Sequence, residues 1–128
     1  MVQQVTKGIK ISISSVFDGK HYQKSQLFYT FTYSITIENK SNDTVQLISR
    51  HWNIFDSLNQ TEEIEGEGVI GEKPILNPNQ SYTYTSHCLI SSPIGSMNGF
   101  YNMINFTTAK EFRVQIPTFQ LIVPSTMN

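Results

Sequence analysis

The sequence predicts an all-β domain in which two β-sheets pack face to face as a sandwich. Apolar and polar residues alternate with a period of two in several segments, which is typical of strands with one buried face. Eight Phe, six Tyr and one Trp accompany many Ile, Val, Thr and Ser residues, a composition that favours strands over helices. About seven such segments follow one another with turn-forming residues between them, which is the sandwich pattern.

The first two strands are expected at residues 8–17 and 28–39. In the first, Ile9, Ile11 and Ile13 alternate with the polar Lys10, Ser12 and Ser14. In the second, aromatic and aliphatic side chains alternate with polar ones from residue 29 to residue 38, so one face is apolar and the other polar. The apolar face of this second strand consists of Tyr29, Phe31, Tyr33, Ile35 and Ile37.

A turn and two further strands are expected in the middle of the chain. Residues 39–43 are Asn, Lys, Ser, Asn and Asp, which tolerate turn geometry and predict a hairpin connection. Residues 44–55 resume strand character, and their alternation changes phase near Ser49, as a β-bulge would cause. Residues 60–64 are a short acidic strand candidate, and residues 66–78 form a loop punctuated by Gly and Pro.

The last three strands are expected at residues 81–90, 99–106 and 111–123. Residues 81–90 alternate again, with Tyr82, Tyr84, Ser86, Cys88 and Ile90 on one side. Pro117 lies inside the final strand and has no N–H to donate to a neighbouring strand. We therefore expect this strand to lie at a sheet edge or to change sheets at that point.

Length, charge and cysteine content limit the classes of function. At 128 residues, the chain is expected to form a single domain, residues 1–128. A net charge of -1 without a basic cluster gives no reason to expect a nucleic acid as partner. The single cysteine, Cys88, cannot form an internal disulfide, and the first ten residues lack the apolar segment of a signal peptide. A cytoplasmic protein without a membrane role is expected, since no apolar run approaches the ~20 residues that span a bilayer.

Residues 66–71 match the GxGxxG string of dinucleotide-binding folds. That fingerprint requires a helix to start behind the glycines, whereas here Pro74 follows and glutamates surround the motif. We therefore expect Gly66, Gly68 and Gly71 to serve backbone geometry. A nest of backbone amides that binds a small anion or a partner's carboxylate remains an alternative.

The string Arg50-His51-Trp52 is the second candidate site. A Trp in the middle of a sandwich strand is usually part of the core, so Trp52 is expected there. Alternation then turns His51 to the other face, beside a neighbouring strand or near the glycines. A hydrogen-bonded structural histidine is favoured over a catalytic one, because no nucleophile has a readable spacing to it. Arg50 is expected to pair with a nearby acid, with a ligand carboxylate as the alternative.

His87 and Cys88 are adjacent, as a thiol and its activating imidazole could be. Neighbouring side chains on a strand point to opposite faces, so we expect no bond between them and a buried, inert thiol. The three histidines and the glutamates show no zinc or calcium ligand spacing. The sequence therefore predicts no catalytic residue, no metal site and no cofactor.

Five ordered strings of the sequence match a known family. They lie at residues 33–39, 50–56, 66–74, 95–99 and 116–119. Together they resemble the bacterial ApaG proteins over nearly the whole chain. The resemblance implies a fibronectin type III or immunoglobulin-like β-sandwich.

The resemblance also implies what is expected of the function. ApaG proteins have no established enzymatic activity, and bacterial members have a genetic association with cobalt resistance and magnesium efflux. Related domains occur in eukaryotic F-box proteins, where protein recognition is the usual assumption. The sequence departs from the family pattern at Asn79, where a Pro-Gly turn is usual, at His87, where Gly often stands, and at residues 105–107.

The leading hypothesis is a non-enzymatic interaction module that binds a protein partner through the glycine loop and the neighbouring exposed faces. The first alternative is a protein that binds a small anion, pyrophosphate or a nucleotide phosphate at this loop. The second is a protein that responds to divalent cations, cobalt or magnesium. The oligomeric state is expected to be either a monomer or a homodimer. The candidate contact residues are Gly66, Gly68, Gly71, Arg50 and His51.

Overall fold

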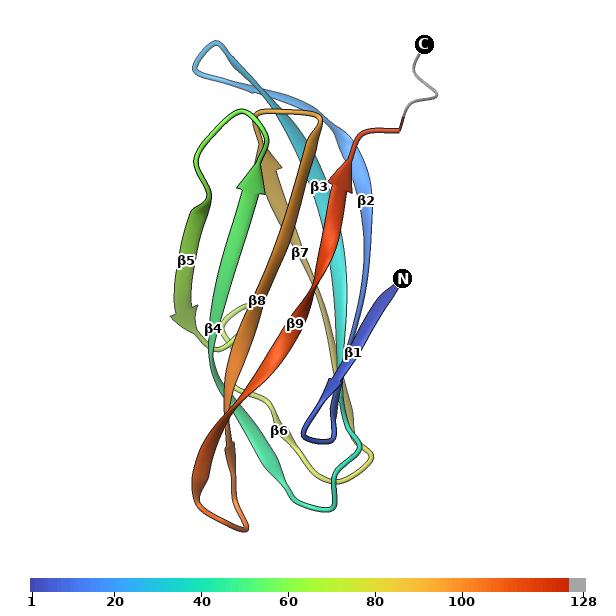
Figure 1. The fold of residues 1–128 in the computed structure, drawn as a ribbon, viewed down its shortest axis with the longest axis vertical. Helices are drawn as coiled ribbons and strands as arrows, with labels where there is room; N and C mark the ends of the chain where they lie inside the picture. Colours follow the sequence, from blue (N-terminus) through green and yellow to red (C-terminus); the bar gives the residue numbers. More distant parts are fainter. Residues whose placement is uncertain (125–128) are drawn as a thin grey trace.

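Residues 1–124 of the computed structural model form two antiparallel β-sheets that lie face to face (Figure 1). Sheet A contains, in spatial order, β1 (Val2–Thr6), β2 (Ile9–Gln23), β3 (Gln26–Asn39) and β7 (Ser81–Ile90). Sheet B contains, in spatial order, β5 (Glu62–Glu67), β4 (Val45–Asp56), β8 (Ile94–Asn105) and β9 (Lys110–Ile122). The two-residue strand β6 (Ile75–Leu76) also pairs with β4.

The predicted all-β sandwich is confirmed, with nine strands instead of about seven. The two additional strands are β1 and β6. The acidic strand begins and ends later than expected, so that two residues of the expected loop, Gly66 and Glu67, belong to β5. Within residues 1–124 there is no helix that could cross a membrane.

The core lies between the sheets and follows the predicted alternation. Ile9, Ile11 and Ile13 are at most 1% exposed, and the predicted apolar face of β3 is buried in the same way from Phe31 onward. Trp52 is buried as expected and packs edge-on against Tyr33, with ring centroids 5.6 Å apart. These contacts join the middle of sheet A to the middle of sheet B.

A β-bulge in β4 determines which side chains of this strand face the core. The register with β8 shifts between Leu47 and Ser49, where the change of phase was expected. Before the bulge, the odd-numbered Leu47 is buried, and after it the even-numbered Trp52 is buried. The bulge thereby places Ser49 and His51 on the outer face of sheet B.

Strand β9 lies at the edge of sheet B, as Pro117 required. The register with β8 is interrupted between Ile116 and Phe119, so Pro117 has no partner in the β8–β9 register. On this side of the sandwich β9 meets β1, because the backbone N–H of Gln115 donates to the hydroxyl of Thr6 at 3.3 Å.

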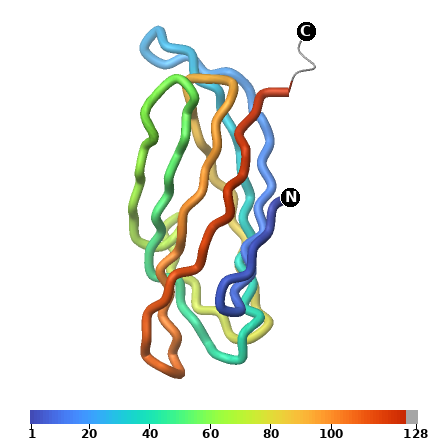
Figure 2. Tube along the Cα trace, viewed as in Figure 1, coloured from blue at the N-terminus to red at the C-terminus, as the bar shows by residue number. Residues whose placement is uncertain are grey.

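The long axis of the molecule is set by its hairpins. Figure 2 shows the β2–β3 hairpin at one end and the β8–β9 hairpin at the other. Strands β1 and β9 are the edge strands that meet on one side of the sandwich, and β5 and β7 are the other edge strands of the two sheets.

Candidate functional site

The outer face of sheet B contains a stacked group of three side chains from three neighbouring strands. The imidazole of His51 on β4 lies parallel to the ring of Phe100 on β8, with centroids 4.8 Å apart and an interplanar angle of 7°. The guanidinium carbon of Arg113 on β9 lies 4.1 Å from the centroid of the same Phe100 ring. We call this group the His51–Phe100–Arg113 platform. A guanidinium over an aromatic face is attracted by the quadrupole of the ring.

Strand β5 holds the imidazole of His51 in place. Its Nδ1 lies 2.8 Å from Oε1 of Glu65, and its Nε2 lies 3.2 Å from Oδ1 of Asn53 and 3.5 Å from Oε1 of Glu63. Both ring nitrogens therefore face oxygen acceptors, so the ring orientation is fixed from both sides. This is the hydrogen-bonded histidine beside a neighbouring strand that the sequence predicted.

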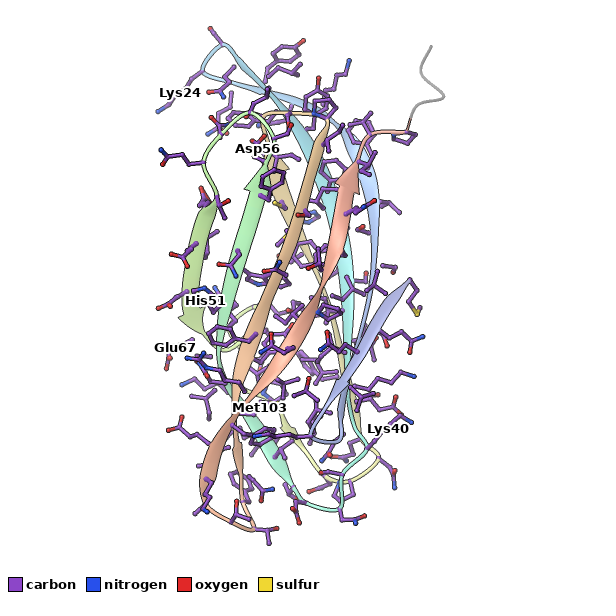
Figure 3. All side chains as sticks on the ribbon, viewed as in Figure 1. Lys24, Lys40, His51, Asp56, Glu67 and Met103 are labelled. Carbon is purple, nitrogen blue, oxygen red and sulfur yellow. The ribbon has the colours of Figure 1, made fainter. Side chains whose placement is uncertain are left out.

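A depression of about 370 Å³ lies beside the platform. Asn102 donates from Nδ2 to the hydroxyl of Ser49 at 2.9 Å in its wall. Figure 3 shows His51 and Glu67 close to the strand β5 at this position. The depression is lined by Ser49, Arg50, His51, Glu65, Gly66, Glu67, Phe100, Asn102 and Arg113.

Arg50 is bonded to backbone oxygens and not to a carboxylate. Its Nη1 donates to the carbonyls of Glu67 and Gly68, both at 2.9 Å. This differs from the acidic partner that the sequence suggested. Gly66 makes the arrangement sterically feasible, because a Cβ at this position would lie 2.7 Å from the guanidinium carbon of Arg50. The absence of a side chain at Gly66 therefore has a packing reason.

The remaining glycines of the motif shape a tight turn. Gly68 has a φ of +60°, and its N–H donates to the carbonyl of Ile48 at 2.8 Å. Val69 and Glu72 exchange two backbone hydrogen bonds of 2.8 Å across a two-residue turn. Both turn residues, Ile70 and Gly71, have positive φ, as in a type I′ hairpin turn.

The motif therefore joins two strand segments and is not followed by a helix. The N–H of Gly68, one of the amides that an anion nest would offer, is already bonded inside the protein. Glu67 of the same loop forms an ion pair with Lys73 at 2.8 Å. Binding of a small anion at the loop stays a prediction.

The structure separates some candidate residues and adds others. Arg50 donates to the glycine loop, whereas His51 stacks on Phe100 in the platform and bonds to Glu65 of β5. Sequence reasoning missed Phe100 and Arg113, which β8 and β9 bring beside His51. In the structure Phe100 alternates with the buried Tyr101 and so lies on the outer face, but no local signal in the sequence showed that β8 lies next to β4.

His87 and Cys88 lie on opposite faces of β7, as predicted. Cys88 is 6% exposed, and burial raises the pKa of its thiol to about 12. His87 is on the outer face of sheet A, where its Nδ1 lies 3.1 Å from the hydroxyl of Thr32. Because Thr32 donates its only proton to Asp18 at 2.8 Å, it accepts from His87. A thiolate–imidazole pair is therefore absent at this position.

Asp56 ends β4 and caps the loops that follow (Figure 3). Burial opposes its negative charge, but hydrogen bonds outweigh this effect and hold the pKa of Asp56 well below its usual range. The N–H and hydroxyl of Ser91 both donate to Oδ2 at 2.7 Å, and the N–H of Leu58 donates to Oδ1 at 3.2 Å.

Across residues 1–124, no group of three or more His, Cys, Asp and Glu side chains is arranged to hold a metal ion.

Comparison with known proteins finds a matching family model and relatives over nearly the whole chain. Residues 19–105 match the model of the ApaG domain. Protein ApaG of Mesorhizobium japonicum is 40% identical over 126 residues, covering 98% of this chain and 96% of the relative. Protein ApaG of Anaeromyxobacter dehalogenans is 36% identical over 128 residues and covers 100% of both chains.

Solved structures show the same fold. The crystal structure of an ApaA protein from Bordetella pertussis is similar with a TM-score of 0.83 and 34% identity, covering 91% of this chain and 94% of the other. A second X-ray structure, from a structural genomics consortium, has a TM-score of 0.87 at 32% identity, with coverages of 94% and 90%. The family model, the relatives and the structures lead to one conclusion: this chain belongs to the ApaG family.

Proposed function

We propose that the protein is a non-enzymatic interaction module that binds another protein through the outer face of sheet B. The contact surface consists of the His51–Phe100–Arg113 platform and the depression between this platform and the glycine loop. The partner presents a carboxylate to Arg113 and an apolar or planar group to Phe100.

The platform is the observation that supports this proposal. Arg113 is exposed, and no carboxylate among residues 1–124 forms an ion pair with it. Its guanidinium is nevertheless held in place by Phe100, at 4.1 Å from the ring centroid. Arginine and aromatic side chains are enriched among the residues that contribute most to protein–protein binding. A planar guanidinium fork also matches a carboxylate with two parallel hydrogen bonds.

The surroundings reduce the entropy cost of binding. Glu65 fixes the ring of His51, and Ser49 fixes the amide of Asn102 through hydrogen bonds of 2.8 and 2.9 Å. All of these groups lie on β-strands, which position side chains more rigidly than loops do. A surface that is ordered before binding loses little freedom when the partner arrives.

The test is crosslinking in the native lysate followed by affinity capture and quantitative mass spectrometry. The wild-type protein is compared with Phe100→Ala and Arg113→Gln. Lys20→Gln is the control, because Lys20 is exposed on β2 of the other sheet and its replacement removes the same charge.

We expect one or more proteins to be captured by the wild type and by Lys20→Gln. Phe100→Ala and Arg113→Gln should capture them at least about tenfold less, since loss of a major contact costs 2 kcal/mol or more. Thermal unfolding checks that each variant is folded. Equal capture by all four proteins, or no capture after crosslinking, would refute the proposal.

A further inference from the structure

A groove lies on the side of the sandwich where β5 and β7 form the two free sheet edges. Two depressions of about 260 and 190 Å³ share Ile54, Glu62 and Leu89 in their walls and so form one continuous feature. We call it the β5–β7 groove. It lies between the sheets, apart from the platform, which occupies the outer face of sheet B.

Strand β7 is an unprotected edge. Its ten residues, Ser81–Ile90, include no Lys, Arg, Asp, Glu, Pro or Gly, and its register with β3 is unbroken. Proteins usually protect a long edge strand with charges, proline or a bulge, because its free backbone groups pair readily with another chain. The facing edge β5 has this protection, with four glutamates among its six residues.

The register shows which backbone groups of β7 are free. The N–H of Asn39 donates to the carbonyl of Gln80 at 2.9 Å, so this is a hydrogen-bonded pair of the antiparallel ladder. Hydrogen-bonded pairs recur at every second residue. The N–H and C=O groups of Thr83, Thr85 and His87 therefore point away from β3 toward the open edge.

The groove is chemically suited to a basic side chain. The strand alternation of β5 turns Glu62 inward with Ile64, and no Lys, Arg or His in the described part of the chain forms an ion pair with Glu62. Asp56, also in the wall, keeps its negative charge through its hydrogen bonds to Ser91. The 190 Å³ depression is lined by both carboxylates, by apolar side chains that include Ile54 and Leu89, and by neutral polar residues, with no basic side chain in its wall. Arg50 and His87 line only the other of these two depressions, where Arg50 donates to the carbonyls of Glu67 and Gly68. Lysine and arginine combine an apolar stem with a cationic end, which matches such a lining.

We propose that an extended segment of another protein adds a strand to β7 and places a Lys or Arg side chain against Glu62. Main-chain hydrogen bonds to β7 supply affinity, and the groove supplies selectivity, as in other cases of strand addition. Alternate residues of the segment face the groove, so an apolar residue is expected two positions from the basic one. This inference concerns a different surface from the platform and does not depend on it.

The test begins with selection of 12-residue peptides from a random displayed library on the immobilised wild-type protein. The selected sequences should share a Lys or Arg with a β-branched or other apolar residue two positions away, and should lack central prolines. A synthetic copy of one selected peptide is then titrated, by fluorescence anisotropy, into wild type, Glu62→Gln and Glu111→Gln. Glu111→Gln is the control, because Glu111 is exposed on β9 and its replacement removes the same charge.

We expect binding to Glu62→Gln to be at least about tenfold weaker, because a charge-assisted hydrogen bond is lost, and binding to Glu111→Gln to be unchanged. Methylation of alternate peptide nitrogens should abolish binding, since it removes the donors that pair with β7. In hydrogen exchange, the bound peptide should protect the amides of Thr83, Thr85 and His87.

Three results would overturn the inference. One is the absence of any enriched peptide, and another is equal affinity of a selected peptide for wild type and Glu62→Gln. The third is protection of the β7 amides by a second copy of the protein without peptide, which sedimentation would reveal as a dimer. If a selected peptide instead loses affinity for Arg113→Gln, it binds the platform, which supports the proposed function but refutes strand addition at β7.

Discussion

The hydroxyl groups of Tyr84 and Tyr101 meet at 2.5 Å in the core and bridge the two sheets. Tyr84 lies on β7 of sheet A and Tyr101 on β8 of sheet B, and Tyr101 is fully buried. Burial raises the pKa of both phenols far above the usual range. Both groups are therefore neutral at physiological pH, and each is the polar partner of the other.

Replacement of Tyr84 by Phe should destabilise the protein by about 1–3 kcal/mol, because it leaves the hydroxyl of Tyr101 buried without its partner. Urea unfolding measures this free energy. The double variant Tyr84→Phe/Tyr101→Phe should lose less than the sum of the two single variants, since it leaves neither hydroxyl unpaired. If the destabilisation of the double variant equals the sum of the two single variants, the contact between the hydroxyl groups contributes nothing to the free energy of unfolding.

Gly66→Ala should also destabilise the protein, by roughly 1–3 kcal/mol, because the new Cβ displaces the guanidinium of Arg50 from two carbonyls. The free energy of unfolding from urea titration is again the measure. In an Arg50→Gln background the same Gly66→Ala substitution should cost less, because the group that it displaces is gone. An equal cost in both backgrounds would mean that backbone strain, not Arg50, requires the glycine.

The lowered pKa of Asp56 should make the free energy of unfolding decrease in acid. Its pKa is lowered in the folded state, so its contribution is fully present above the unfolded value of about 3.9. That contribution decreases as the pH falls below about 4 toward the folded pKa. Urea unfolding at pH 7, 4, 3 and 2 should show this decrease in the wild type. Asp56→Asn should be less stable at pH 7 and lose less on acidification, and parallel curves would contradict the assignment.

Cys88 should react slowly with thiol reagents in the folded protein. A pKa of about 12 makes the thiolate fraction at pH 8 on the order of a thousandfold smaller than for an unperturbed cysteine. Ellman's reagent should therefore react quickly only after denaturation. His87→Ala should leave the slow rate unchanged, because the imidazole faces away from the thiol. A further decrease in this variant would show that His87 activates Cys88.

The alternation of residue types predicted most of the core but not every strand. Tyr33 was expected in the core because it lies on the apolar face of a clear strand, and Trp52 because a Trp in the middle of a sandwich strand usually lies there. Strand β1 escaped prediction because its sequence, VQQVT, is largely polar and depends on pairing with β2. Strand β6 has two residues and exists only through its contact with β4.

The candidate site was predictable only in part, for a topological reason. The orientation of His51 followed from that of Trp52, because adjacent side chains of a strand alternate. The neighbours of His51 did not follow, because the order β5-β4-β8-β9 brings together strands that are far apart in the chain. Asn79 is a departure from the family pattern that the structure explains, since its φ of +71° is one that asparagine tolerates better than most residues do.

The bulge in β4 has an evolutionary consequence. Because it sets the phase of the strand, loss of one codon between Ser49 and Trp52 would exchange the inward and outward positions on either side of the gap. Trp52 would then turn toward the outer face of the sheet, so the same deletion would disrupt both the core and the His51–Phe100–Arg113 platform. This stretch can therefore accept substitutions over evolutionary time, but single-residue insertions and deletions should be eliminated by selection.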